Sequence, residues 1–308
     1  MAAIPAVPAL RAVPTADAAP GEPPAAAVLI DNLTVSYRQH PAVHHVSCRF
    51  DTGSLTAIVG PNGAGKSSLL DALVGRIAPT TGRIQLAVPG RSRIAYLPQQ
   101  NQIDRTFPLR VADVVMLGAW PSLGLFGGAS AAMRERAASA LHQVGLDGLG
   151  HRQVGELSVG QFQRVLFARV LLQQAPLILL DEPFNAIDNR TTADLLQLVH
   201  RWHAEGRTVV AVLHDLDQVR AHFPDTVLLA REVIAAGPSS EVLTPANLQR
   251  AREMAERWDD AAAWCHRNES GEPPGLTIVN AAGHLHSHAH GTAGAHTHAH
   301  GPADQATR

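Results

Sequence analysis

The sequence predicts an α/β fold with a mostly parallel sheet, and three observations lead to this prediction. Strand-like apolar runs alternate with helical patterns through the middle of the 308-residue chain, as they do in α/β proteins. A glycine-rich segment, residues 60–65, separates one such run from a helical pattern. Residues 177–180 are wholly apolar and are followed by two acids, which is typical of a parallel strand buried on both faces.

The first half of the folded region is predicted to contain strands and one helix. Residues 28–37 alternate between apolar and polar side chains, which indicates a half-buried strand. Residues 55–59 form a short apolar run that ends at a glycine, and residues 67–74 have a helical pattern. Residues 93–97 form a strand that ends before Pro98, because proline cannot donate to a strand ladder.

The second half begins with helices and continues with strand–helix alternation. Helical patterns at residues 111–117 and 131–144 are joined by a glycine-rich loop, and an amphipathic helix is predicted over residues 161–172. The stretch 108–172 is therefore expected to be an inserted helical subdomain. After the apolar strand at 177–180, the expected helices are residues 191–203 and 215–221, and the expected strands are residues 208–213 and 226–230.

The two ends of the chain differ from this region in composition. Residues 1–27 are dominated by proline and alanine, and we expect a disordered arm without a secretory signal, because prolines interrupt its apolar stretch. Residues 268–308 consist mainly of glycine, alanine and histidine, and we expect a disordered tail. The folded domain is thus expected over residues 28–267.

The overall composition excludes several classes of protein. The formal net charge is −2 and hydrophobic residues make up 45% of the chain, so neither a basic nucleic-acid binder nor a wholly disordered chain is expected. No segment offers the roughly 18 uninterrupted apolar residues that a membrane-spanning helix needs. The two cysteines lie far apart, which favours a reducing cytosol over a disulfide framework.

A phosphate-binding loop is predicted at residues 60–67, because GPNGAGKS matches the pattern G-x-x-x-x-G-K-[ST] between a strand and a helix. Glycines let backbone N–H groups turn towards phosphate oxygens, and a helix N-terminus attracts negative charge. Lys66 is expected on the β- and γ-phosphates of a nucleotide and the Ser67 hydroxyl on Mg²⁺. The residues expected to bind the nucleotide here are Gly60, Pro61, Asn62, Gly63, Ala64, Gly65, Lys66, Ser67 and Ser68.

Two acids complete the predicted site. Asp181 and Glu182 follow the apolar strand, and the carboxyl ends of parallel strands face the ligand crevice. Asp181 is expected to hold Mg²⁺, directly or through water, and Glu182 is expected to orient or deprotonate the attacking water. Such a pair would otherwise suggest a helix N-cap, but the upstream phosphate loop favours the catalytic role.

Further motifs resemble those of ABC-transporter ATPases, over about residues 28–250. The sequence LSVGQ at residues 157–161 is similar to the family signature LSGGQ and precedes the acidic strand, as it does in the family. Tyr37, Gln99, the segment NAID at residues 185–188 and His214 match further family motifs in the family's order. The resemblance implies a P-loop NTPase core with an antiparallel β subdomain and an inserted helical signature subdomain.

The resemblance implies roles for three residues within one chain. Tyr37 would stack on adenine, Gln99 would contribute to catalysis and to the Mg²⁺ site, and His214 would act in catalysis as the switch histidine. Each has a structural alternative: Tyr37 as a packed strand aromatic, Gln99 as a polar loop residue, and His214 as a hydrogen-bonded core histidine.

The signature residues are implied to act across an ATP-dependent homodimer. Ser158, Gly160 and Gln161, together with Asp188, would contact a nucleotide that sits on the P-loop of a second copy. Ser158 is also expected to cap the following helix. Val159 replaces the usual glycine, and because a β-branched residue rarely adopts positive φ, an ordinary backbone conformation is expected there.

Three segments carry a finer resemblance, to the ATPases of zinc- and manganese-type metal importers: residues 103–108, 111–115 and 161–169. The expected function is therefore the ATP-hydrolysing subunit of an importer of a divalent metal ion, with zinc as the first choice. Siderophore-iron and vitamin-B12 importer ATPases share much of the same pattern, so a manganese or an iron-siderophore importer remains an alternative.

A second metal site is expected on the tail. Neutral imidazole is a common Zn²⁺ ligand, and histidines two residues apart on a flexible chain can converge on one ion. A purification tag and a solvated low-complexity tail are alternatives, and imidazole also suits Cu²⁺, Ni²⁺ and Co²⁺. The histidines expected to bind Zn²⁺ are His284, His286, His288, His290, His296, His298 and His300.

The resemblance also implies partners and a location. They are separate transmembrane permease subunits and an extracytoplasmic metal-binding protein, with this chain on the cytoplasmic face of the membrane. A soluble ABC-type ATPase usually carries two ATPase modules or long coiled coils, and neither is predicted in this sequence. A metal-buffering protein with a vestigial ATPase is disfavoured because Lys66, Asp181, Glu182 and His214 are all present.

Overall fold

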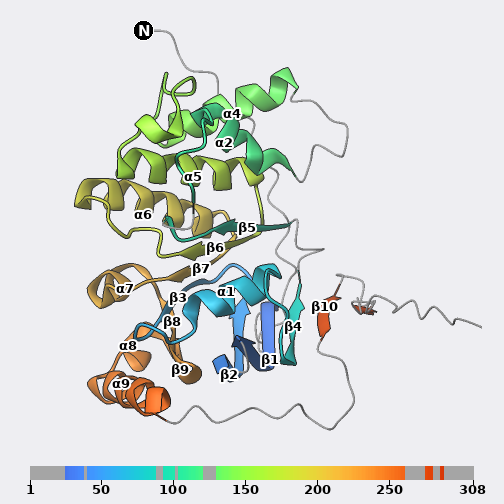
Figure 1. Ribbon diagram of the computed structural model, residues 1–308, viewed down its shortest axis with the longest axis vertical. Helices are drawn as coiled ribbons and strands as arrows, with labels where there is room; N and C mark the ends of the chain where they lie inside the picture. The colour runs from blue at the N-terminus through green and yellow to red at the C-terminus, as the bar shows by residue number, and fades with distance from the viewer. Residues whose placement is uncertain are drawn as a thin grey trace, which may run out of the picture.

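The computed structural model describes residues 25–37, 40–87, 93–100, 103–120 and 130–260, together with the backbone of residues 275–279 and 285–287. Two sheets and a group of helices are arranged in layers (Figure 1). This arrangement confirms the predicted α/β class with an antiparallel β subdomain. Within the described ranges, no helix is both long and apolar enough to cross a lipid bilayer.

The central sheet has six strands in the order β5-β6-β7-β3-β8-β9. All neighbouring pairs are parallel except β8 and β9, which are antiparallel. Every residue of β3, β6 and β7 is buried, which explains why their sequences are mostly apolar. The strands are β3 (Leu55–Val59), β5 (Ile94–Leu97), β6 (Leu177–Asp181), β7 (Thr208–Val212), β8 (Asp225–Ala230) and β9 (Glu232–Pro238).

The second sheet has β1 (Ala26–Tyr37) between β2 (His40–Asp51) and β4 (Thr81–Leu86), and both pairs are antiparallel. Two short strands extend it: β10 (Gly275–Val279) lies parallel to β4, and β11 (Leu285–Ser287) lies antiparallel to β10. The structure therefore differs here from the expectation that the whole segment 268–308 lacks regular structure.

The helices lie on both sides of the central sheet. Between β5 and β6, the described residues form helices and loops, and this helical region lies at the top of Figure 1. Its elements are α2 (Val111–Met116), η3 (Leu117–Ala119), α4 (Ala131–Gln143), η4 (Val154–Glu156) and α5 (Val159–Gln173). The others are α1 (Lys66–Val74), α6 (Asn189–Ala204), α7 (Leu216–His222), α8 (Ser239–Val242) and α9 (Pro245–Asp260).

Two hydrophobic cores cover the two faces of the central sheet. On one face, α1 packs between this sheet and the antiparallel sheet. On the other face, α2, α4, α5, α6, α7 and α9 contribute to one core, in which the rings of Phe167 and Trp202 stack with centroids 5.7 Å apart. The sheet is thus fixed from both sides, and the carboxyl ends of its parallel strands lie beside the N-terminus of α1.

Candidate active site

A polar pocket of about 310 Å³ lies where the loops after β3, β6 and β7 meet. These three strands are adjacent and parallel, so the segments that follow them meet at one edge of the sheet. The loop after β3 supplies the predicted phosphate-binding residues, the segment after β6 supplies Glu182 and the segment after β7 supplies His214. The pocket is lined by Ala42, Asn62, Gly63, Ala64, Gly65, Lys66, Ser67, Ser68, Glu182 and His214.

Two glycines allow the loop after β3 to lie close to neighbouring backbone. Gly60 has φ +156° and Gly65 has φ +88°. A Cβ on Gly60 would lie 1.9 Å from the Leu229 carbonyl oxygen, and one on Gly65 would lie 2.1 Å from the Ala42 carbonyl oxygen. Because real Cβ contacts are never this short, only glycine fits at either end of the loop.

Lys66 places a buried positive charge at this pocket. Its side chain is 6% exposed, and Nζ donates hydrogen bonds to the carbonyl oxygens of Gly60 and Pro61, both at 2.8 Å. Burial lowers the pKa of Lys66, and the nearby charges of Glu182 and Asp181 partly offset that effect. Lys66 is also the first residue of α1, so the ammonium group and the helix N-terminus both attract anions to this pocket.

Asp181 and Ser67 form an oxygen-donor pair that fits Mg²⁺. The Ser67 hydroxyl donates to Oδ1 of the fully buried Asp181 at 3.2 Å. Oδ2 of Asp181 has no hydrogen-bond partner among the described residues. Burial raises the pKa of Asp181 to about 6, against the opposing effect of the Ser67 hydrogen bond. An unpaired buried carboxylate oxygen beside a hydroxyl matches the preference of Mg²⁺ for hard oxygen ligands.

Glu182 is held by three side chains. Gln99 Nε2 and Asn185 Nδ2 donate to Oε2 at 2.7 and 3.1 Å, and His214 Nε2 is hydrogen-bonded to Oε1. Burial alone would raise the pKa of Glu182, but the hydrogen bonds from His214, Asn185 and Gln99 and the charge of His214 lower it below its ordinary value. The carboxylate is therefore ionised at neutral pH and can accept a proton or orient water.

The backbone of Glu182 is left-handed. Its φ is +49°, a conformation that costs free energy for a residue with a long side chain. The Glu182 N–H donates to the Val212 carbonyl oxygen at 3.2 Å, so the turn after β6 is tied to β7. This strained turn fixes the direction of the carboxylate with respect to the pocket.

The signature residues lie at the start of α5, away from this pocket. Ser158 Oγ accepts from the Gln161 N–H at 3.2 Å, and Gln161 Oε1 accepts from the Ser158 N–H at 3.0 Å, which confirms the predicted N-cap. Val159 begins α5 and is absent from the described residues with positive φ, so the ordinary conformation expected there is confirmed.

Two further predicted residues have structural partners outside the pocket. Asp188 caps α6 and accepts from the Thr191 N–H at 2.9 Å. A Cβ on Gly160 would lie 3.6 Å from Oδ2 of Asp188, so the signature turn and the cap of α6 are neighbours. Ser158, Gly160, Gln161 and Asp188 are not among the residues that line the polar pocket of their own chain.

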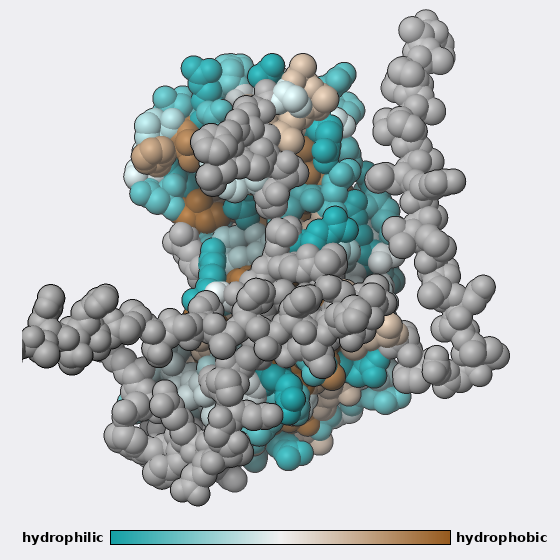
Figure 2. All heavy atoms as spheres, turned by 90° about the vertical axis from the view of Figure 1, so that its right-hand side faces the viewer, coloured by the Kyte–Doolittle hydropathy of each residue, from teal (hydrophilic) through white to brown (hydrophobic). Residues whose placement is uncertain are grey.

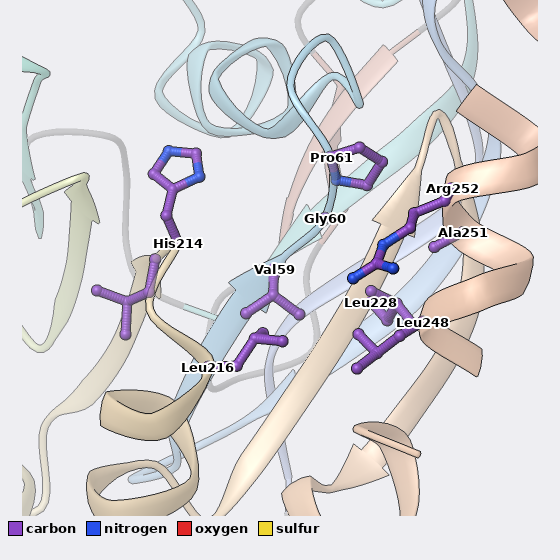
Figure 3. Close-up of a pocket in the computed structure, with 10 residues that line it drawn as sticks. Val59, Gly60, Pro61, His214, Leu216, Leu228, Leu248, Ala251 and Arg252 are labelled. Carbon is purple, nitrogen blue, oxygen red and sulfur yellow. The ribbon is translucent and has the colours of Figure 1, made fainter. Parts of the chain in front are cut away.

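A second cavity, of about 180 Å³, lies on the other side of the loop that contains Gly60 and Pro61 (Figure 3). Leu216, Leu228 and Leu248 make it largely apolar, and Arg252 extends over it from α9. An apolar cavity does not suit a polyphosphate. The polar pocket between Lys66 and Glu182 is therefore the candidate active site.

The structure brings together most of the predicted site and adds residues that the sequence did not indicate. Tyr37 is 47% exposed and its hydroxyl lies 3.5 Å from Ser68 Oγ, so a role in adenine stacking stays a prediction. Asn185 belongs to a family motif, but it was not predicted from the sequence as a site residue. Its position three residues after Glu182 could have indicated that the two side chains meet. Ala42 lines the pocket from β2, a strand that local sequence did not predict.

The histidine-rich tail lies outside the described residues, except for the backbone of residues 285–287. In the part of the chain that the structure describes, no group of three or more His, Cys, Asp or Glu side chains could hold a metal ion. The predicted Zn²⁺ site on the tail therefore stays a prediction.

Several known proteins resemble this chain. Residues 43–185 match the family model described as ABC transporter. A manganese transport system ATP-binding protein of Listeria monocytogenes is 42% identical, over 72% of this chain and 94% of that protein. A zinc transport system ATP-binding protein of Treponema pallidum is 39% identical, over 73% of this chain and 86% of that protein. A dimeric ATP-binding cassette solved in a post-hydrolysis state with ADP and phosphate is 27% identical, with a TM-score of 0.61, over 69% of this chain and 98% of that chain.

Proposed function

The chain belongs to the ATP-binding subunits of ABC transporters and is an ATPase, and we propose that its hydrolysis of ATP powers the uptake of a divalent metal ion. The observation that carries this proposal is the identity of 42% and 39% to proteins named for manganese and zinc transport, over most of the length of each. Manganese and zinc are equally supported as the metal, so the initial preference for zinc is not retained.

The geometry of the pocket accounts for ATP hydrolysis. Lys66 and the N-terminus of α1 bind and orient the phosphates, while Ser67 and Asp181 are the residues that would hold Mg²⁺. When bound, Mg²⁺ supplies positive charge that stabilises the phosphate oxygens. The ionised Glu182 orients the attacking water and takes its proton, and His214 and Gln99 fix the direction of its carboxylate.

We place the complete ATP site between two copies of the chain. The signature residues lie outside the polar pocket of their own chain, and in this arrangement a second copy brings its own Ser158 and Gly160 to the nucleotide. The first turn of α5 offers backbone N–H groups to an anion. The dimeric cassette that holds ADP and phosphate supports this arrangement.

A groove on the helical region is proposed to receive a cytoplasmic helix of a separate permease. It has a volume of about 320 Å³, and Ile103, Leu109, Val114 and Leu117 contribute apolar walls. Phe107, Leu117 and Trp120 are 62%, 48% and 72% exposed. Apolar residues also gather in small groups on the upper, helical part of the surface in Figure 2. Exposed apolar residues around a groove are typical of a protein–protein contact, and a transport subunit needs such a contact with a membrane-spanning partner.

The same proposal includes an extracytoplasmic metal-binding protein as a further partner, and it places this chain on the cytoplasmic face of the membrane.

Metal uptake by cells that lack this chain tests the proposal. We expect uptake of radioactive Mn²⁺ or Zn²⁺ to fall to background and to return with the wild-type chain but not with Glu182→Gln. Uptake of an iron-siderophore serves as the control and should not change. Loss of iron-siderophore uptake with unchanged Mn²⁺ and Zn²⁺ uptake would instead establish the alternative substrate.

The histidine-rich tail is proposed to bind Zn²⁺ independently of ATP hydrolysis, as a receiver of imported metal. Seven histidines without acids between them form an imidazole chelator. Calorimetric titration of Zn²⁺ should show binding to the full chain and less binding to a chain that ends before Gly283. Equal stoichiometry in the two proteins would refute the proposal. The two chains should hydrolyse ATP equally fast, because the P-loop, Glu182 and His214 lie in the described domain.

A further inference from the structure

Two side chains of the segment after β5 hold the backbone at the start of α5. Arg105 Nη2 donates to the Val154 carbonyl oxygen at 3.3 Å and to the Leu157 carbonyl oxygen. Gln100 Nε2 donates to the Val159 carbonyl oxygen at 3.1 Å. The carbonyl groups that accept these hydrogen bonds lie on both sides of Ser158, the residue that caps α5.

The position of Arg105 is well defined. Its guanidinium lies over the Phe162 ring, with Cζ 4.8 Å from the ring centroid, and Phe162 is a fully buried residue of α5. A planar guanidinium can stack on a ring while its N–H groups donate to carbonyl oxygens, whereas an ammonium group has no planar face to stack. Arg105 is half-buried, so solvent weakens these hydrogen bonds less than it would at the surface.

The same segment also contacts the catalytic centre and the groove. Gln99, next to Gln100, donates to Glu182. Ile103 and Asp104, next to Arg105, line the groove proposed for the permease. One short segment thus contacts the catalytic carboxylate of its own ATP site, the groove, and the signature turn that serves a second copy.

We propose that Arg105 is a positioning residue for the signature motif. It holds the turn at residues 154–158 so that Ser158 and the free N–H groups of α5 meet a nucleotide bound to a second copy, and Gln100 supports the same turn. Arg105 itself does not contact the nucleotide. The proposal rests on the homodimer described under the proposed function.

ATP-dependent dimerisation of the Glu182→Gln chain tests the role of Arg105. In that background, Arg105→Ala should raise the protein concentration needed for half-maximal dimerisation by about tenfold or more, because each homodimer contains two signature turns. Binding of ATP to the monomer should change less than about twofold, since Arg105 is not among the residues that line the polar pocket. Arg105→Lys should give an intermediate value, because lysine keeps the charge but loses the planar stacking on Phe162.

Arg136→Ala is the matched control. Arg136 Nη2 donates to the Leu172 carbonyl oxygen and to Gln174 Oε1 at 3.3 and 2.8 Å, so it holds the opposite end of α5 in a similar way. This variant should lower the thermal unfolding temperature without weakening dimerisation. If it weakens dimerisation as much as Arg105→Ala, or if Arg105→Ala dimerises like its parent, the proposal is wrong.

The same experiment distinguishes an error in the proposed homodimer from an error in the role of Arg105. If the Glu182→Gln chain itself stays monomeric at saturating ATP, the homodimer is wrong and the role of Arg105 is wrong with it. If the parent dimerises and Arg105→Ala does not fold, the Arg105→Lys value decides: dimerisation equal to the parent overturns the proposal.

Discussion

Replacement of Glu182 by glutamine should leave ATP binding intact and reduce hydrolysis by about 10²–10⁴-fold, the range for loss of a general base. Glutamine has nearly the same shape, so the P-loop and Lys66 can still bind the phosphates. A neutral amide cannot take a proton from the attacking water. Steady-state release of phosphate and binding of a fluorescent ATP analogue by the purified variant measure the two effects.

The control for Glu182→Gln is the same chemical change at an exposed position. Glu135 lies on the surface of α4, and Glu135→Gln should hydrolyse ATP at the wild-type rate. Near-wild-type turnover by Glu182→Gln would show that another group activates the water.

Protonation of Asp181 should weaken Mg²⁺ binding to the ATP-bound chain by up to about tenfold for each pH unit below about pH 6. Burial raises the pKa of Asp181 to about 6, and a protonated carboxyl group is not a Mg²⁺ ligand. Below that pH, binding must therefore displace a proton from Asp181. Above it, the carboxylate is already ionised and the affinity should become independent of this group.

Calorimetric titration of Mg²⁺ between about pH 5 and pH 8 measures this dependence. The terminal phosphate of ATP also gains a proton near pH 6, so the wild-type curve contains two titrations. Asp181→Asn keeps the contribution of ATP and removes that of Asp181. The variant should bind Mg²⁺ more weakly at pH 8 and with a shallower pH dependence. Equal slopes for the two chains would show that Asp181 does not titrate in this range.

The parallel core and the phosphate loop were predictable because local sequence determines both. β3 and β6 are buried on both faces, and such strands have continuous apolar sequences. The loop after β3 needs glycines at positions 60 and 65, because a Cβ there would lie 1.9 and 2.1 Å from backbone carbonyl oxygens, so its pattern is specific. A buried parallel strand and a glycine-rich loop can each be recognised from adjacent residues alone.

β2 shows why part of the fold could not be predicted. It contains His40, Pro41, His44 and His45, residues that are not typical of strands, and its pairing with β1 stabilises it. β4, β9 and α9 were likewise not identified from the sequence. Their structures depend on packing against the sheets, and intrinsic preference is only a weak guide where tertiary contacts decide.

Parts of the candidate site depend on distant contacts in the same way. The left-handed backbone of Glu182 is held by β7 through Val212. Arg105 reaches the signature turn from a segment about 50 residues earlier in the chain. Neither the strained turn nor this contact leaves a pattern in the surrounding sequence, so both become visible only in the structure.

The central claim is that two copies of this chain together form each ATP site. Light scattering of the Glu182→Gln chain with and without Mg²⁺ and ATP tests it most directly. The predicted mass without nucleotide is that of one chain, 32.7 kDa, and saturating Mg²⁺ and ATP should double it. A mass that stays at 32.7 kDa, while ATP binding to the same sample is confirmed, would contradict the claim.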